Sequence, residues 1–183
     1  EKFNIGDDKT IVIYSGNFRP WAQCIEIIES MNLWPPDTVL IMHTWNKAVL
    51  NDDYCQQMFI RAKKFPVFFS TDYLSYEELS IALSSADIGL LYYEEIDDNF
   101  TEICFSSNKM SEYLASGLPV ICSPFPSLKE FVEGNQIGVA VGFHEIGDSI
   151  KIIKSNYIIY SDQVRKCCEK HFIFDKYYKE VFG

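Results

Sequence analysis

The chain has 183 residues, 48% of them hydrophobic and 15% aromatic, which is enough for one domain with a buried core. Sixteen basic residues against 26 acidic ones give a formal net charge of −10, which argues against a nucleic-acid partner and against a basic membrane-binding patch. No apolar run reaches the roughly 20 residues of a membrane-spanning helix, so we expect a soluble domain without a transmembrane segment.

The six cysteines have neither the C-x-x-C spacing of a zinc site nor an evident disulfide framework. The three histidines, His43, His144 and His171, lie far apart in the sequence and lack companion ligands at a recognisable spacing. Reduced thiols favour a cytoplasmic protein. We therefore expect no metal site, and we interpret the acidic stretch at residues 94–98 as a solvated lid rather than a cation site.

Apolar bursts alternate with helical patterns along the chain, which is typical of a parallel sheet covered by helices on both faces. Strands are predicted at residues 10–15, 38–42, 66–69, 88–92, 119–122 and 139–141. Helices are predicted at residues 20–31, 46–64, 76–85, 107–116 and 127–133, with two or three more from about residue 145. Ser75 and Glu78 form a capping box at the start of the third helix. This order indicates a single α/β domain over residues 1–183.

One further segment combines a helix start with a buried strand. Ser106 or Ser107 can cap this helix, and Gly117 stands where the helix must end. Lys109 and Glu112 fall on one face of its first turns, where unpaired backbone N–H groups and the helix dipole favour anions. A cation and a carboxylate at a helix start suit a phosphate and a ribose. The alternative is that the two side chains form a solvated surface pair.

Eight residues of this segment match the pattern S-x-N-K-x-x-(D/E)-Y-x-x-x-G-x-P-V, namely Ser106, Asn108, Lys109, Glu112, Tyr113, Gly117, Pro119 and Val120. With them the chain resembles the carboxy-terminal half of GT-B glycosyltransferases, particularly the bacterial retaining enzymes of glycosyl transferase group 1. The resemblance implies a Rossmann-like α/β domain whose donor substrate is a nucleoside diphosphate sugar, such as a UDP-sugar, with no cofactor and no metal. It also implies an amino-terminal acceptor domain, so we expect this sequence to be part of a longer chain.

Ligands of such sheets bind beside the carboxyl ends of the strands. The residues that the resemblance assigns to the donor there are Gly16, Asn17, Arg19, Asp72, Tyr73, Leu74, Ser106, Ser107, Asn108, Lys109 and Glu112. In this assignment Glu112 holds the ribose, the segment 72–74 frames the base, and the remaining residues hold the diphosphate. No catalytic residue is assigned.

The chain departs from the family pattern at two places, since Trp21 and Gln23 stand where relatives carry a second cation, and Cys104 stands where many carry a glutamate. These departures favour a non-catalytic α/β interaction domain as one alternative, and a sugar-nucleotide epimerase of the same fold is another. A dinucleotide dehydrogenase is disfavoured because the first loop, Gly16 to Arg19, is not G-x-G-x-x-G.

The hypothesis with the most support is the donor-binding domain of a glycosyltransferase. The resemblance favours hexosyl or related glycosyl transfer to an unknown acceptor in bacterial surface polysaccharide synthesis. Because the acceptor domain lies outside this sequence, we expect the isolated domain to bind donor and to transfer little. The base, the sugar, the stereochemical course and a peripheral membrane contact of the longer protein stay open.

Overall fold

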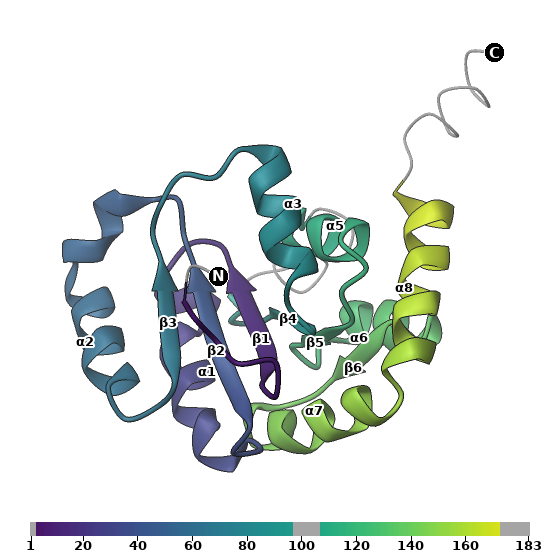
Figure 1. The fold of residues 1–183 in the computed structure, drawn as a ribbon, viewed down its shortest axis with the longest axis horizontal. Coiled ribbons are helices and arrows are strands. Elements are labelled where there is room, and N and C mark those ends of the chain that lie inside the picture. Colours follow the sequence, from purple (N-terminus) through teal and green to yellow (C-terminus); the bar gives the residue numbers. More distant parts are fainter. Residues whose placement is uncertain (1–2, 97–106, 173–183) are drawn as a thin grey trace.

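The computed structural model of the chain describes residues 3–96 and 107–172 (Figure 1). Its strands are β1 (Thr10–Ser15), β2 (Thr38–His43), β3 (Val67–Ser70), β4 (Ile88–Leu91), β5 (Val120–Cys122) and β6 (Gly138–Ala140). Its α-helices are α1 (Cys24–Ser30), α2 (Asp53–Ala62), α3 (Tyr76–Ser84), α5 (Asn108–Ala115), α6 (Pro126–Gly134), α7 (Ile146–Ser155) and α8 (Tyr157–His171). Short 3-10 turns lie at Pro20–Ala22, Met31–Leu33, Lys47–Asn51 and Phe143–Glu145.

All six strands are parallel and follow the order β3-β2-β1-β4-β5-β6. The chain builds outward from β1 to β3, then crosses back and builds outward from β4 to β6. The direction therefore reverses between β1 and β4, and the loops that follow these two strands diverge at the carboxyl edge of the sheet. The predicted Rossmann-like α/β fold is confirmed.

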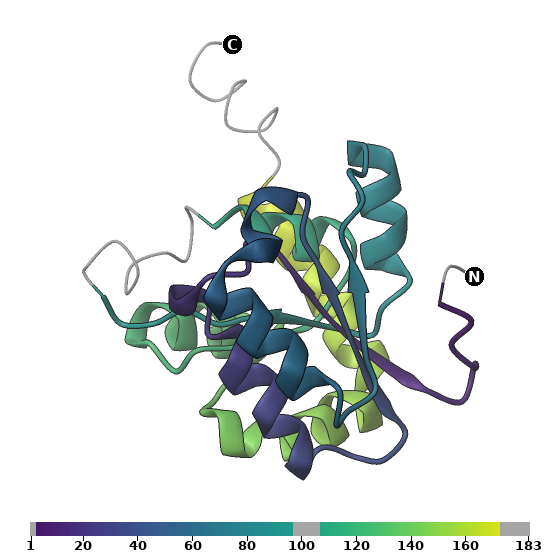
Figure 2. The ribbon, with the colours of Figure 1, turned by 90° about the vertical axis from the view of Figure 1, so that its left-hand side faces the viewer.

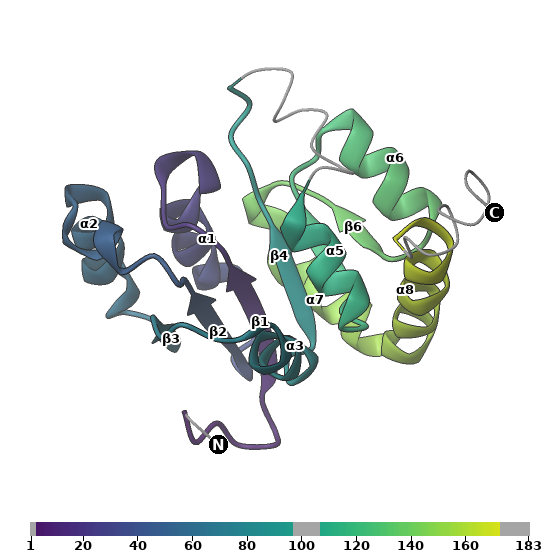
Figure 3. The same ribbon diagram turned by 90° about the horizontal axis from the view of Figure 1, so that it is seen from above.

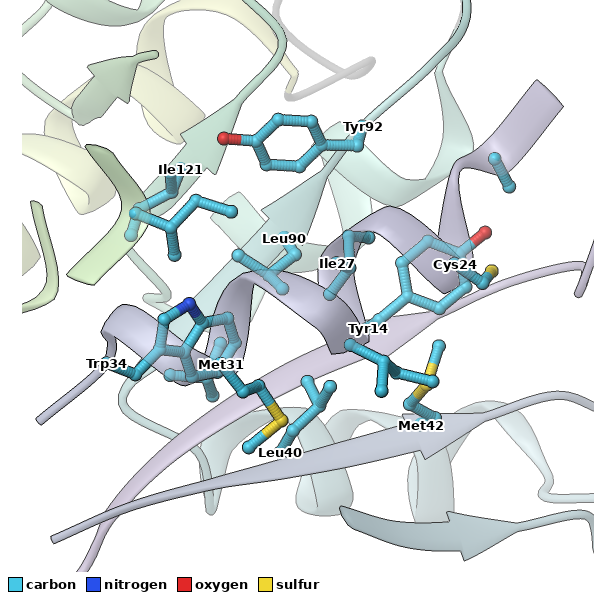
Figure 4. Packing of buried hydrophobic residues seen from close by; sticks show 14 of the residues in the cluster. Tyr14, Cys24, Ile27, Met31, Trp34, Leu40, Met42, Leu90, Tyr92 and Ile121 are labelled. Atoms are coloured by element: carbon cyan, nitrogen blue, oxygen red, sulfur yellow. The ribbon is translucent and has the colours of Figure 1, made fainter. Parts of the chain in front are cut away.

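Helices cover both faces of the sheet with two separate apolar cores. One core contains residues of α1, α2 and α7, and the other contains residues of α3, α5, α6 and α8. Figures 2 and 3 show α3 across the strands from α1 and α2. Along β1 the side chains alternate as a strand requires, because Val12 and Tyr14 enter the first core and Ile13 enters the second. Figure 4 shows Tyr14 with Leu40 and Leu90 in the first core.

Two predicted helices are interrupted in the structure. The segment 20–31 was expected to be continuous, but Gln23 has a left-handed φ of 52°, so a 3-10 turn comes first and α1 begins at Cys24. The N–H of Gln23 closes that turn on the carbonyl of Pro20 at 2.8 Å. The segment 46–64 divides at Asp52, whose carboxylate accepts the N–H of Cys55 at 2.9 Å and caps α2.

Two local predictions about helix caps are confirmed. The Ser75 hydroxyl accepts the N–H of Glu78 at 3.2 Å, and the Glu78 carboxylate accepts the N–H of Ser75 at 2.7 Å. Ser107 is the cap of α5, while Ser106 lies outside the described residues. Asp87, just before β4, accepts the N–H of Ile11 in β1 at 2.7 Å, which is a contact between two distant segments rather than a helix cap or a turn. Among residues 3–96 and 107–172, no helix has the length and apolar character needed to cross a bilayer.

Candidate functional site

A cavity of about 410 Å³ opens at the carboxyl edge of the sheet, where the strand order reverses. It lies between the loop after β1, the end of β2, the end of β4 and the first turn of α5. The predicted donor-binding residues that line this cavity are Gly16, Asn17, Ser107, Asn108, Lys109 and Glu112. The structure therefore brings together residues from two segments that are about half the chain apart.

Helix α5 is fixed to the sheet by Tyr113. Its hydroxyl accepts the N–H of Ser15 at 2.9 Å and donates to the carbonyl of Leu90 at 3.3 Å, so it joins the ends of β1 and β4. The ring fits because residue 89 is glycine, where a Cβ atom would lie 2.6 Å from the ring. Lys109 precedes Tyr113 by four residues and lies on the same side of α5. The packing of Tyr113 thus sets the position of Lys109 at the cavity.

Lys109 is a buried cation, with 9% of its surface exposed. Its ammonium donates to the Tyr14 hydroxyl at 3.2 Å and lies 4.6 Å, 4.4 Å and 5.9 Å from the ring centres of Tyr14, Tyr93 and Trp21. No carboxylate of the described residues pairs with it. Burial lowers the pKa of Lys109 to about 8. Burial of a cation without a counter-charge is unfavourable, so this ammonium is a strong candidate for binding an anion.

Glu112 lies one turn further along α5 and is half-buried. Its carboxylate lines the cavity and has no hydrogen-bond or ion-pair partner among the described residues. Burial raises the pKa of Glu112, while the nearby charge of Lys109 opposes that rise. The alternative that Lys109 and Glu112 form a solvated surface pair is wrong, because Lys109 is buried and makes no ion pair with Glu112 in the structure.

The loop after β1 approaches Lys109 closely. A Cβ atom at Gly16, whose φ is 156°, would lie 3.2 Å from both the Lys109 side chain and the Tyr14 hydroxyl, so a glycine allows this approach. The N–H of Gly16 donates to the carbonyl of His43 at 2.9 Å, which joins the loop to β2. The amide oxygen of Asn17 is buried and accepts no hydrogen bond from the described residues.

The side chain of Arg19 pairs with Asp52 outside the cavity. Its guanidinium donates to the Asp52 carboxylate at 2.9 Å, and Arg19 does not line the cavity. The pair joins the loop after β1 to the capping residue of α2. The predicted role of Arg19 at the diphosphate therefore stays a prediction. Ser106 and Cys104 lie outside the described residues.

The segment predicted to frame a base lies beside the cavity rather than in it. Asp72 is exposed and pairs with Lys47 at 3.7 Å, and Tyr73 is 79% exposed. Leu74 lines a second cavity of about 500 Å³, which lies between α3, the strands β1 and β2 and the amino-terminal segment. His43 and Leu79 line both cavities, so the two are adjacent.

Three aromatic residues of the cavity were not assigned a role from the sequence: Trp21, Trp45 and Tyr93. The rings of Trp21 and Tyr93 stack at 6.3 Å with an angle of 9° between their planes. Each of the three follows the carboxyl end of a strand, and that position is the signal that could have identified them. In the described parts of the chain, no group of three or more potential metal ligands is arranged around a common point.

Comparison with known proteins identifies the family and the fold. A family model described as glucosyltransferase 3-like, C-terminal domain, matches residues 42–176. Among solved structures, HepE of Anabaena in complex with UDP-glucose superposes with a TM-score of 0.75 at 13% identity, over 98% of this chain and 49% of that chain. Sucrose-phosphate synthase of Thermosynechococcus elongatus has a TM-score of 0.74 at 17% identity, over 99% of this chain and 47% of that chain. None of the curated proteins compared with the chain matches it.

A further solved structure is itself a single domain. The C-terminal domain of the group 1 glycosyl transferase LpcC from Francisella tularensis has a TM-score of 0.65 at 16% identity, over 92% of this chain and 86% of that chain. The chain spans about half the length of the HepE and sucrose-phosphate synthase structures. At these identities the likeness concerns the fold, which is that of the carboxy-terminal half of GT-B glycosyltransferases.

Proposed function

The chain belongs to the family of glucosyltransferase 3-like C-terminal domains, and on this basis we propose that its 410 Å³ cavity binds a nucleoside diphosphate sugar as the donor of a glycosyl transfer. The observation that carries the proposal is the buried ammonium of Lys109 without a paired carboxylate, next to the unpartnered carboxylate of Glu112. A nucleoside diphosphate supplies both missing partners, since it carries an anionic diphosphate and a ribose with two hydroxyl donors.

The diphosphate binds at the start of α5. There Lys109 supplies a positive charge in a poorly solvated position, and the helix start with Ser107 and Asn108 adds the favourable end of the helix dipole. Gly16 and Asn17 bring the loop after β1 against the same group. Glu112 accepts hydrogen bonds from the ribose hydroxyls, because an ionised carboxylate is an acceptor only and the hydroxyls are donors.

The base extends away from α5 toward the end of β2. At that end the cavity is lined by His43, Trp45 and Leu79, and the adjoining cavity is lined by Leu74. The segment 72–74 would then frame the edge of the base through its backbone. UDP is the first nucleotide to test, because HepE was solved in complex with UDP-glucose.

The groups that bind the diphosphate would also assist the transfer of the sugar. As the bond to the sugar breaks, negative charge grows on the leaving diphosphate, and the fixed charge of Lys109 and the start of α5 stabilise it. We propose that a hexose is transferred, that the acceptor is held by a second, amino-terminal domain, and that no cofactor takes part. WaaG, another structural neighbour, acts in lipopolysaccharide biosynthesis, and we propose a comparable role in surface polysaccharide synthesis, in the cytoplasm where free thiols such as Cys24 stay reduced.

Calorimetric titration of the 183-residue chain with UDP, GDP, CDP, ADP and dTDP, with and without Mg²⁺, tests the proposal. We expect one diphosphate to bind, and Lys109→Met and Glu112→Gln each to weaken it at least about tenfold, as the loss of a charged hydrogen bond does. Lys129→Met, at an exposed position on α6, is the matched control and should bind like the wild type. Equal affinity of Lys109→Met and the wild type, or no binding of any of the five, would show that the cavity is not a donor site.

A further inference from the structure

We propose that the indole of Trp45 is the surface on which the base of the donor nucleotide stacks. This inference rests on the proposed donor site and adds a binding residue that the sequence did not assign. Trp45 follows β2 and lines the 410 Å³ cavity, while 62% of its surface is exposed. It is thus a large aromatic side chain that is positioned by the fold and left largely uncovered.

The distribution of charge in the cavity sets the direction of the ligand. The only charged side chains that line it, among the described residues, are Lys109 and Glu112, and both are on α5. The strand β1 lies between β2, which leads to Trp45, and β4, which precedes α5. A nucleoside diphosphate has the same division, with an anionic end and a flat aromatic end. When its phosphates lie at Lys109, its base points toward Trp45.

The other aromatic side chains of the cavity already have partners. Trp21 and Tyr93 stack on each other at 6.3 Å, and both rings face the ammonium of Lys109. Trp45 has no ring partner among the described residues. Of the three, its indole is therefore the one whose face is available for stacking, and stacking also removes exposed apolar surface from water.

The loop that carries Trp45 is anchored on both sides. The N–H of Thr44 donates to the carbonyl of Ser70 at 2.9 Å, and the N–H of Asn46 donates to the Thr44 hydroxyl at 3.3 Å. Lys47 pairs with Asp72 at 3.7 Å and so joins this loop to the segment 72–74. The face of the base would rest on Trp45 while that segment frames its edge.

The test compares a nucleotide with a ligand that lacks the base. UDP, or whichever diphosphate binds, and inorganic pyrophosphate are titrated by calorimetry into the wild type, Trp45→Phe, Trp45→Ala and Lys109→Met. We expect Trp45→Ala to weaken the nucleotide at least about fivefold, the lower end of base stacking, and to leave pyrophosphate unchanged. Trp45→Phe should keep most of the nucleotide affinity because its ring can still stack. Lys109→Met should bind both the nucleotide and pyrophosphate more weakly.

The control is Tyr76→Ala, which removes a tyrosine that is 85% exposed on α3 and lines neither cavity. Since Trp45 is exposed, its variants should melt at the wild-type temperature. Tryptophan emission gives a second readout, because nucleotide should quench the wild type more strongly than Trp45→Phe, in which Trp21 still lines the cavity. The stacking role alone is overturned if Trp45→Ala binds the nucleotide as tightly as the wild type does, or if its affinity for pyrophosphate falls as much as its affinity for the nucleotide. If the wild type binds neither the nucleotide nor pyrophosphate, both the donor site and the stacking role of Trp45 are overturned.

Discussion

The ammonium of Lys109 lies 3.2 Å from the hydroxyl of Tyr14, and this hydroxyl in turn donates to the carbonyl of Asn17 at 2.8 Å. One oxygen atom therefore joins the cation on α5 to the loop after β1. Tyr14 is fully buried, and its ring lies in the core beneath α1 next to Cys24 (Figure 4). The position of the charged group at the cavity thus depends on packing on the opposite face of the sheet.

Replacing Tyr14 by Phe should weaken the binding of UDP without changing the fold. The ring keeps its contact with Lys109, but both hydrogen bonds of the hydroxyl are lost. We expect about 3- to 30-fold weaker UDP binding by calorimetry, the effect of a hydrogen bond to a charged group. Because the hydroxyl stabilises the charged amine, the pH at which UDP affinity falls should also move to a lower value in this variant.

Tyr92→Phe is the control for that experiment. The Tyr92 hydroxyl donates to the carbonyl of Val141 at 2.8 Å, in the same core but away from the cavity. Both variants should lose comparable stability in urea unfolding, and only Tyr14→Phe should lose UDP affinity. Equal effects of the two variants on UDP, or an unchanged pH profile in Tyr14→Phe, would mean that Tyr14 serves packing alone.

The buried Lys109 should also affect the pH dependence of stability. Burial lowers its pKa to about 8, against 10.5 for the unfolded side chain, so between these values the unfolded chain binds more protons. The contribution of Lys109 to stability therefore rises with pH across this window, by at most about 1.4 kcal/mol per pH unit. Buried thiols act in the opposite sense, since burial raises the pKa of Cys24 to about 12. The quantity to measure is thus the difference in unfolding free energy between the wild type and Lys109→Met.

UDP affinity should change in the opposite direction over the same range. A neutral Lys109 no longer supplies charge to the diphosphate, so we expect wild-type affinity to fall as the pH rises through about 8. In Lys109→Met the weak residual affinity should be independent of pH there. If the stability difference between the two proteins stays constant from pH 7.5 to 10, the amine does not titrate in this window and the prediction is contradicted.

The elements that follow from local chemistry were predictable. The capping box of Ser75 and Glu78 depends on residues three apart, so it can be identified without knowing the rest of the fold, and the cap of α5 could be limited to Ser106 or Ser107. The number of possible strand orders was also small, because buried strands that alternate with helices form only a few parallel topologies. Glu112 and Lys109 were placed at a ligand site for a related reason, since both lie in the first turns of a helix that follows a strand and loop.

The surroundings of Lys109 could not be predicted from its own segment. The sequence paired Lys109 with Glu112 near the start of α5, but its ammonium is enclosed by Tyr14, Trp21 and Tyr93, which come from other segments of the chain. Trp21 lies in the 3-10 turn that ends at Gln23, whose left-handed backbone is uncommon for a residue other than glycine. A non-local arrangement of this kind leaves no periodic pattern in the sequence.

Gly89 allows Tyr113 to hold α5, so Gly89→Ala should disturb both stability and binding. The new methyl group would lie 2.6 Å from a ring that is fully buried and fixed by its hydroxyl. We expect a loss of about 1–3 kcal/mol in urea unfolding, as for other overpacked sites, and weaker UDP binding as α5 moves. Gly134→Ala is the control, because nothing lies within 4 Å of its added methyl group. If Gly89→Ala is as stable as the wild type, the ring of Tyr113 can shift to accommodate the methyl group, and the prediction is contradicted.

Arg19 separates two explanations of how the diphosphate is held. In the structure it pairs with Asp52 at 2.9 Å, and both side chains are at least one-third exposed, so this pair should contribute no more than about 1 kcal/mol to stability. We expect Arg19→Gln to change UDP affinity by less than about threefold, within the range of an exposed charge, whereas Lys109→Met loses binding. Arg61→Gln, in the exposed pair with Glu29, is the control for removing a surface guanidinium. A loss in Arg19→Gln as large as that in Lys109→Met would mean that Arg19 leaves Asp52 when the nucleotide binds, and the role expected from the family pattern would then be correct.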